Sequence, residues 1–452
     1  MKIAIVGGGI SGLSTYLFLE QQLAKDERLK DAFDITIFEP HDIPRLGNER
    51  ADDIPSSGGG YGLAGNGMAS LRRLSPTLHD QILRNGFPSP KFVMKSARGW
   101  SLGVMPFTDL RGAPPECCVM VLREVFVAAL YERIPASVIV QHKVLKVEDG
   151  NDQAIIELDN GEILNYDLVV GADGVWSKAR CAVLGDKYPP EYRGLFTVAG
   201  WVSTDYLPPP AETGPTAHGQ TVMTFGPNGF FAYTPYTTGN ISANEKHIRG
   251  EATLPPGKSA FWWSRSAQED SKANPDNAEL KQELEKRHSL WGDPMILRII
   301  QASEVALKIP TFVMPKVPTW VGQRVVLIGD AAHALPSSSG QGVSQCLEDA
   351  EAFANPLAFN LAEVNKEEVD LKTLGTTFAQ YIKVRKAHVE KVLDAGNKAG
   401  DSSRDLNYVI ELAMYGMTWA MLKLFGAFFL KTIMDYDLLA EIEKVKKQSR
   451  SN

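Results

Sequence analysis

The stretch MKIAIVGGGISG, residues 1–12, predicts a nucleotide-binding turn between a buried strand and a helix. Residues 2–6 are predicted to be that strand, because residues 3–6 are uniformly apolar, as is typical of a parallel strand covered on both faces. Gly7, Gly9 and Gly12 then form Gly-x-Gly-x-x-Gly. The first glycine allows the tight turn, the second lets a pyrophosphate approach the backbone, and the third lets the next helix pack closely. That helix, expected over residues 11–22, would direct its free N–H groups at the phosphates.

An acidic residue after a second strand supports this interpretation. Residues 34–38, DITIF, are predicted to be that strand, and Glu39 follows directly. A carboxylate in this place accepts hydrogen bonds from an adenosine ribose. Strand, glycines, helix, strand and acid stand in the expected order, so dinucleotide binding is favoured over a purely structural turn.

Composition limits the function further. The chain has 452 residues, 44% of them hydrophobic, and a net charge of −7. This length predicts two or three domains, and the charge offers no basic surface for nucleic acid. The four cysteines are too few for a disulfide scaffold and lack the spacing of a metal site, so no metal is expected. No signal peptide is expected before a strand at residue 2, and a cytoplasmic location is predicted.

Two features before residue 131 point to contacts with a bound group. Gly59 and Gly60 belong to a glycine run that brings the backbone close to a neighbour, either as a turn before a helix or at the edge of a flavin ring. Arg123 is the only cation in the apolar stretch 118–131, expected to be a turn leading into a helix. A buried arginine is costly without a counter-charge, so Arg123 should meet a cofactor phosphate or a protein carboxylate.

Two further apolar strands, 166–170 and 323–328, each lead into a glycine-containing turn. The second turn ends where Gly340 and Gly342 open a helix. His333 lies inside this turn and is interpreted as a structural polar residue rather than a catalytic one.

Two later regions have distinct compositions. Residues 185–301 are rich in aromatic side chains, which are typical of a sheet core and can also line a site for a flat apolar ligand. The polar stretch at 277–288 within this region is expected to be a helix. Residues 408–434 are unusually apolar, but three charged residues interrupt them, so no run approaches the ~18 residues of a membrane-spanning helix. We expect this segment to pack against the body of the protein, with membrane-surface contact or a dimer interface as the alternative.

Three motifs together resemble the single-component FAD-dependent monooxygenases that hydroxylate aromatic compounds. They are the N-terminal glycines with Glu39, the Asp-Gly motif Asp173-Gly174-x-x-Ser177-x-x-Arg180, and the Gly-Asp motif Gly329-Asp330-Ala331-Ala332-His333 with Pro336 and Gly340-Gln341-Gly342. Their order and spacing fit that family. The resemblance runs from residue 1 to about residue 385 and is weakest over 185–301.

The resemblance implies an α/β fold: a doubly wound FAD-binding domain interrupted by a mixed β-sheet substrate domain, with a C-terminal helical region. The FAD-binding domain would comprise residues 1–75, 111–184 and 302–400. The substrate domain would comprise residues 76–110 and 185–301, and the C-terminal helices residues 401–452.

The resemblance also implies roles for single residues. Glu39 would hold the adenosine ribose, Arg123 would contact the FAD, and Asp330 would bond its ribityl chain. Asp173, with Arg180, would serve the pyrophosphate region and the passing nicotinamide cofactor. The pyrimidine edge of the flavin would lie at a helix N-terminus, which stabilises negative charge on the reduced ring; the residues there are Gly340, Gly342 and Val343.

The implied reaction follows from the cofactor. NADPH or NADH reduces the flavin, O2 adds to give a flavin hydroperoxide, and one oxygen passes to a hydrophobic aromatic or heteroaromatic small molecule by hydroxylation or epoxidation. An indole or polyketide of specialised metabolism would suit so aromatic a site. Two alternatives stay open: a flavin oxidoreductase without oxygen insertion, and a flavoprotein cyclase without redox turnover.

The chain also departs from the family pattern. Many relatives carry an arginine beside the glycine of a substrate-domain strand, where this chain has Ala199-Gly200-Trp201; this leaves the substrate-anchoring role of that arginine open. Tyr233 matches a position where relatives often have a tyrosine facing the substrate, and it is the predicted catalytic side chain. The Gly-Asp motif continues with Val343-Ser344 rather than the commoner Ala-Asn.

Overall fold

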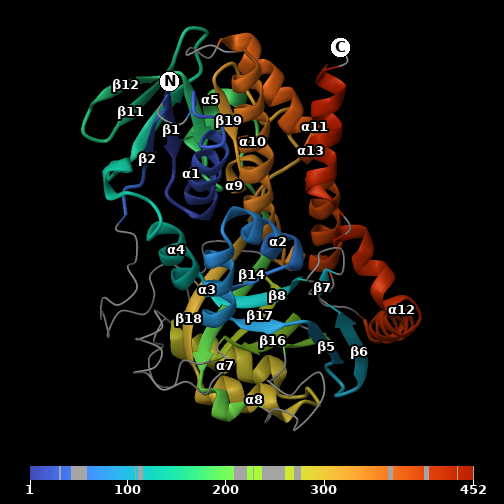
Figure 1. Ribbon diagram of the computed structural model, residues 1–452. Coiled ribbons are helices and arrows are strands. Elements are labelled where there is room, and N and C mark those ends of the chain that lie inside the picture. Colours follow the sequence, from blue (N-terminus) through green and yellow to red (C-terminus); the bar gives the residue numbers. More distant parts are fainter. Residues whose placement is uncertain are drawn as a thin grey trace.

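A parallel sheet around the glycine motif forms one end of the molecule (Figure 1). Its strand order is β19-β13-β1-β2-β9, and every neighbouring pair is parallel. These strands are β1 (Lys2–Val6), β2 (Asp34–Phe38), β9 (Ile139–Val140), β13 (Leu168–Gly171) and β19 (Val325–Leu327). The predicted α/β fold, with a parallel sheet built around the glycine motif, is thereby confirmed.

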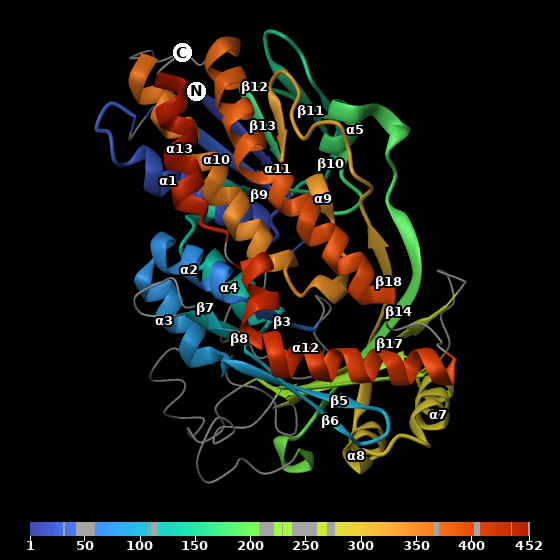
Figure 2. The same ribbon diagram turned by 90° about the vertical axis from the view of Figure 1, so that its right-hand side faces the viewer.

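The structure is a computed structural model, and the residues that it describes are 1–29, 32–41, 59–106, 108–109, 116–207, 221–227, 229–236, 260–268, 276–364, 370–401, 407–434 and 436–450. Within these ranges both ends of the chain lie near the five-stranded sheet (Figures 1 and 2).

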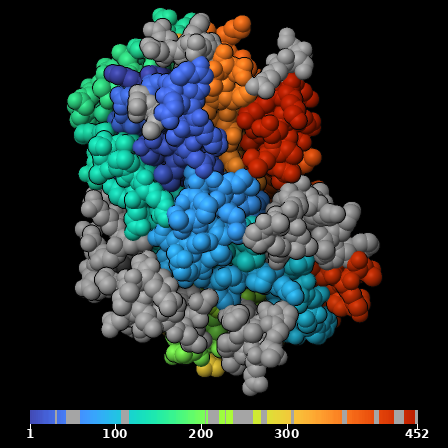
Figure 3. Space-filling view, in the orientation of Figure 1, coloured from blue at the N-terminus to red at the C-terminus, as the bar shows by residue number. Residues whose placement is uncertain are grey.

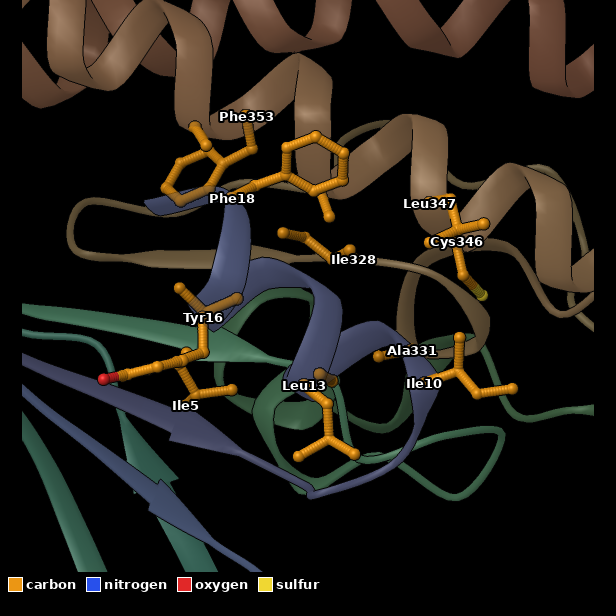
Figure 4. Packing of buried hydrophobic residues seen from close by; sticks show 14 of the residues in the cluster. Ile5, Ile10, Leu13, Tyr16, Phe18, Ile328, Ala331, Cys346, Leu347 and Phe353 are labelled. Atoms are coloured by element: carbon orange, nitrogen blue, oxygen red, sulfur yellow. The ribbon is translucent and has the colours of Figure 1, made fainter. Parts of the chain in front are cut away.

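Two long helices pack together over this sheet. α1 (Ile10–Leu23) follows the glycine turn, and α10 (Gly342–Val364) follows the Gly-Asp motif. Phe18 of α1, Phe353 of α10 and Ile328 gather in one buried core (Figure 4). The first and third motifs are therefore held side by side although more than 300 residues separate them in sequence.

A seven-stranded mixed sheet forms the other half, in the order β18-β14-β17-β16-β15-β5-β6. Only β15 and β5 pair in parallel. Helices α7 (Asn277–His288) and α8 (Pro294–Ala302) cover one face, where Phe231 stacks on Trp262. The strands are β5 (Lys91–Ser96), β6 (Ser101–Pro106), β14 (Glu191–Val202), β15 (Thr221–Gly226), β16 (Gly229–Pro235), β17 (Ala260–Ala267) and β18 (Glu304–Val313).

Smaller elements connect the two halves. A four-stranded sheet holds β3 (Gly60–Leu63), β4 (Phe87–Ser89), β7 (Thr108–Asp109) and β8 (Glu116–Leu122), and α2 (Gly65–Leu74), α3 (Pro76–Asn85) and α4 (Arg123–Tyr131) pack around it. β10 (Val144–Glu148), β11 (Ala154–Leu158) and β12 (Ile163–Tyr166) form an antiparallel meander.

Residues before α4 correct one prediction. The expected turn at residue 118 is instead strand β8, which pairs with β3 and β4. A short apolar run is compatible with a strand, a turn or part of a helix, and its pairing partners decide which of these it adopts.

The predicted domain boundaries shift in two places. β18 is an edge strand of the seven-stranded sheet, so this sheet extends past residue 301. α3 packs on α2, α4 and β8 rather than on that sheet, so the boundary at residue 76 is early. The division into three domains stays a prediction.

The C-terminal region contains α11 (Leu371–Asp401), α12 (Tyr408–Met434) and α13 (Leu438–Arg450). The predicted C-terminal helices of residues 401–452 are α12 and α13, and Asp437 precedes α13 and accepts a hydrogen bond from the Ala440 N–H at 3.1 Å. α12 lies along β5 and β6 (Figure 2) and forms an outer edge of the molecule (Figure 3). Among the described helices, none combines the length and the apolarity needed to cross a bilayer.

Candidate functional site

The glycine turn has the geometry that its sequence predicts. Gly7 has a φ of +105°, and a Cβ on it would lie 2.5 Å from the Ala172 carbonyl oxygen. A Cβ on Gly12 would lie 1.9 Å from the Gly7 carbonyl oxygen, so α1 can approach β1 only without a side chain there. A Cβ on Gly9 would meet no atom within 4 Å. The turn is closed on the protein side and open on the other, where the α1 N-terminus has no side-chain cap.

Glu39 lies against this turn at the end of β2. One carboxylate oxygen accepts a hydrogen bond from the Gly8 N–H at 2.8 Å, and the other accepts one from the His41 N–H at 3.0 Å. Two backbone groups therefore orient the acid beside the open side of the glycine turn.

Asp330 and Arg123 come together from distant segments. Asp330 begins the short helix α9 (Asp330–His333), and Arg123 begins α4, where its N–H donates to the Gly59 carbonyl at 3.1 Å. The Asp330 side chain is exposed, yet the protein around it desolvates the carboxylate and raises its pKa, while His333 and Arg123 act in the opposite direction. Arg123 is exposed rather than buried, so the expected cost of burying its charge does not arise.

Asp349 fixes the Gly-Asp turn from behind. This buried carboxylate accepts hydrogen bonds from the Gly329 N–H at 3.0 Å, from His333 Nε2 at 2.5 Å and from Arg385 Nε at 2.8 Å. Burial raises the pKa of Asp349, but His333 and Arg385 outweigh burial and hold the pKa at about 2. Arg385 also donates to Glu348 at 3.0 Å. This network was not predicted from the sequence, although two adjacent acids within an apolar helix are a signal that a cation must meet them.

The turn that leads into α10, where the flavin edge is predicted to lie, is also open. Gly340 has a φ of +61°. A Cβ added to Gly340 or to Gly342 would meet no described atom within 4 Å. Val343 is half-buried at the start of α10. The Ser344 hydroxyl accepts a hydrogen bond from the Ala64 N–H at 3.1 Å, so this departure from the family pattern anchors α10 to the start of α2.

The side chains of the Asp-Gly motif are engaged within the protein. Asp173 accepts hydrogen bonds from the Ser177 hydroxyl at 2.5 Å and the Lys178 N–H at 2.6 Å. Ser177 caps α5 (Lys178–Leu184) by accepting a hydrogen bond from the Arg180 N–H at 2.8 Å. Arg180 donates to the Ala331 carbonyl at 3.1 Å. Arg180 thus joins the Asp-Gly turn to the Gly-Asp turn.

Two tyrosines have different surroundings. Tyr233 packs in the core between the seven-stranded sheet and α7 and α8, on the face away from the three turns. This placement argues against the predicted catalytic role. Tyr236 instead contacts Trp201 and Phe261, and a Cβ on Gly60 would lie 1.8 Å from its hydroxyl. The Tyr236 hydroxyl is buried and has no hydrogen-bond partner in the described part of the chain.

FAD fits these residues. Space is open at Gly9, Gly340 and Gly342, an uncapped helix N-terminus faces the first opening, and Asp330 and Arg123 are both exposed. The fold and the site define a flavoprotein with FAD as its cofactor. The chain belongs to the FAD binding domain family, whose model matches residues 113–395.

Similar proteins are monooxygenases and epoxidases by name. A chloroplastic zeaxanthin epoxidase of an Oncidium hybrid cultivar is 24% identical over 402 residues, covering 86% of this chain; the chain spans 53% of that protein, about half its length. An aurachin C monooxygenase/isomerase of Stigmatella aurantiaca is 25% identical over 366 residues, covering 79% of this chain and 81% of that protein. Klebsiella pneumoniae HpxO, solved with FAD and uric acid, has a TM-score of 0.71 at 18% identity over 97% of each chain, which supports the fold.

Proposed function

We propose that the protein is a monooxygenase that uses NADPH or NADH and O2 to hydroxylate or epoxidise a hydrophobic aromatic or heteroaromatic small molecule. The observation that carries the proposal is the convergence of open glycine turns beside one aromatic sheet face. Bound FAD would supply the redox and oxygen chemistry. An indole or polyketide metabolite has the flat apolar shape that this face favours.

In this proposal the backbone binds most of the cofactor. The open turn at Gly7, Gly9 and Gly12 holds the pyrophosphate at the α1 N-terminus, and Glu39 accepts hydrogen bonds from the ribose hydroxyls. The Asp-Gly motif at Asp173 supports the pyrophosphate region through its backbone, because its carboxylate is already used.

The flavin end of the cofactor would meet the remaining predicted residues. Asp330 accepts hydrogen bonds from the ribityl hydroxyls, and Arg123 balances its charge. Gly59 and Gly60 pack against one ring edge. The start of α10 at Gly340, Gly342 and Val343 would hold the pyrimidine edge.

The aromatic face of the seven-stranded sheet would keep water from the reacting atoms. Trp201, Phe261 and Trp263 lie on this face, at contacts of 5–6 Å between ring centroids. Excluding water favours oxygen transfer over unproductive decay.

The test is a labelling experiment on the FAD-loaded protein. The protein is reduced anaerobically with NADPH or NADH in the presence of a panel of indoles and aromatic polyketides, and ¹⁸O2 is then admitted. We expect a product that carries one ¹⁸O atom. A product without the label contradicts the monooxygenase and favours the oxidoreductase alternative; turnover without consumption of NAD(P)H favours the cyclase.

We further propose a cytoplasmic location with contact to a membrane surface or a second copy through α12. Val409, Met417 and Leu424 are 68–73% exposed on one side of this helix. The acidic residue of α12, Glu411, is buried and bound to Arg98 at 3.0 Å, so it adds no negative charge to that surface.

A further inference from the structure

Arg265 on β17 is a buried cation with no counter-charge among the residues that the structure describes. Arg265 is 6% exposed, and its Nε has no hydrogen-bond partner among the described residues. Arg265 forms no ion pair with an acid of the described part of the chain. Its guanidinium carbon lies over the Phe230 ring, 5.3 Å from the ring centroid. Burial alone lowers its pKa to about 10, so it stays positively charged at neutral pH.

Two other buried arginines show what a structural role requires. Arg385 is 0% exposed and meets two carboxylates, Glu348 and Asp349. Arg180 is 4% exposed and donates to two backbone carbonyls. An uncompensated buried charge costs several kcal/mol, so an arginine kept without such partners indicates a counter-charge that arrives with a ligand.

A second unpartnered group stands directly opposite. Thr197 of β14 pairs with Arg265 across the strands, and its hydroxyl is also buried without a partner. Residues directly opposite in neighbouring strands point to the same face and lie about 5 Å apart. Thr197 and Arg265 therefore place a hydroxyl and a guanidinium together on one face of the sheet.

Contacts at both ends of β14 locate this pair relative to the flavin turns. At one end Trp201 touches Tyr236, whose hydroxyl meets Gly60. At the other end Leu195 lies beside Gly400, which also adjoins Ser338 in the turn before Gly340. Positions 195, 197, 199 and 201 share one face because side chains alternate along a strand. The Thr197–Arg265 pair thus lies on the sheet face between the two turns proposed to hold the flavin ring.

We propose that Arg265 and Thr197 form a subsite that binds an oxyanion of the substrate, a carboxylate or an ionised phenol or enol. This inference rests on the proposed function only in taking the ligand to be the substrate. A guanidinium can bind a carboxylate through two parallel hydrogen bonds, and the threonine hydroxyl adds a third donor. The cation comes from β17, the strand next to the Ala199-Gly200-Trp201 segment that lacks the arginine of many relatives.

The test measures binding of matched anionic and neutral probes to the FAD-loaded protein by equilibrium dialysis. The pairs are benzoate and benzamide, 1-naphthoate and 1-naphthamide, and indole-3-carboxylate and indole-3-carboxamide. A phenol arm uses 4-nitrophenol, whose absorbance reports whether the ionised form is bound. Because a hydrogen bond to a charged group contributes about 1.5–3 kcal/mol, we expect at least one anion to bind roughly tenfold or more tightly than its neutral partner.

Three variants decide the outcome. Arg265→Gln should abolish the preference for the anion, and Arg265→Lys should retain part of it. Arg298→Gln, at an exposed arginine beside Tyr206, is the matched control and should leave it unchanged. FAD content equal to that of the unmodified protein shows that each variant is folded. No anion preference in any pair, or a preference that survives Arg265→Gln, overturns the subsite.

The outcome is separable from that of the labelling experiment. Arg265-dependent anion binding without ¹⁸O in any product leaves the subsite standing and removes the monooxygenase. If neutral substrates give labelled product at rates that Arg265→Gln does not change, the monooxygenase stands and the subsite is removed.

Discussion

Replacing Asp349 with asparagine removes the charge that holds the Gly-Asp turn, while keeping the size of the side chain. Asp349 is 0% exposed and accepts hydrogen bonds from Gly329, His333 and Arg385. The variant keeps one carbonyl oxygen as acceptor but leaves Arg385 with Glu348 as its remaining carboxylate. The change therefore acts on the turn that begins with Gly329 and Asp330.

The expected loss follows from the pKa of the carboxylate. The folded protein holds the pKa of Asp349 at about 2, and an unfolded chain has an aspartate pKa of about 3.9. That difference corresponds to about 2.6 kcal/mol of stability at neutral pH. Removing one member of a buried pair costs ~3–5 kcal/mol, and since Arg385 keeps Glu348 we expect about 3 kcal/mol for Asp349→Asn.

The sign of the pH dependence follows from the same pKa. A pKa that is lower in the folded state contributes stability that is complete above the unfolded pKa and is lost as the pH falls through the folded one. The difference between the unmodified protein and Asp349→Asn should therefore be full at neutral pH and about half as large at pH 3.

The assay is urea unfolding of the FAD-loaded protein, followed by the rise in flavin fluorescence as FAD is released. Asp394→Asn is the control, because Asp394 forms an exposed ion pair with Lys316 and such pairs contribute about 0–1 kcal/mol. If Asp349→Asn costs no more than Asp394→Asn, the Asp349 network does not hold the turn.

Three further predictions concern other parts of the molecule. Gly12→Ala should abolish FAD retention, because its Cβ would lie 1.9 Å from the Gly7 carbonyl oxygen. Gly416→Ala, whose Cβ would meet no described atom within 4 Å, should keep FAD. Flavin absorbance per chain measures both variants, and full occupancy in Gly12→Ala contradicts the packing argument. Arg265→Met should raise the stability of the substrate-free protein by about 1–3 kcal/mol, because an unpaired buried charge is removed; an unchanged or lower thermal midpoint speaks against that cost. The double variant Met417→Glu/Leu424→Glu should reduce either sedimentation with anionic vesicles or dimer formation in light scattering. Leu439→Glu on α13, at a residue that is 41% exposed, should reduce neither. If the double variant changes neither property, a contact through α12 is excluded.

Local sequence signals predicted much of the fold. The helix expected at 277–288 is α7, because Asp276 caps it by accepting a hydrogen bond from the Glu279 N–H at 2.8 Å. The strand at 2–6 and the strand at 34–38 are also present with the predicted limits. These elements have their start and stop signals within a few residues, so their limits are readable without tertiary information.

Features that depend on distant partners were not predictable in the same way. Strand β8 needed β3 and β4 to distinguish it from a turn. The Asp349–Arg385 pair joins two helices across 36 residues, and helical periodicity does not encode such a pair. Tyr233 shows a further limit: a motif match fixes a position, but one step along a strand decides which face the side chain takes.

The most direct measurement of the central claim is the flavin content of the purified chain. We predict a yellow protein that releases one FAD per chain on acid treatment and takes up FAD again after the cofactor is stripped, with the uptake weakened by Asp330→Ala. A colourless protein that fails to bind added FAD contradicts the account of three turns converging on one cofactor.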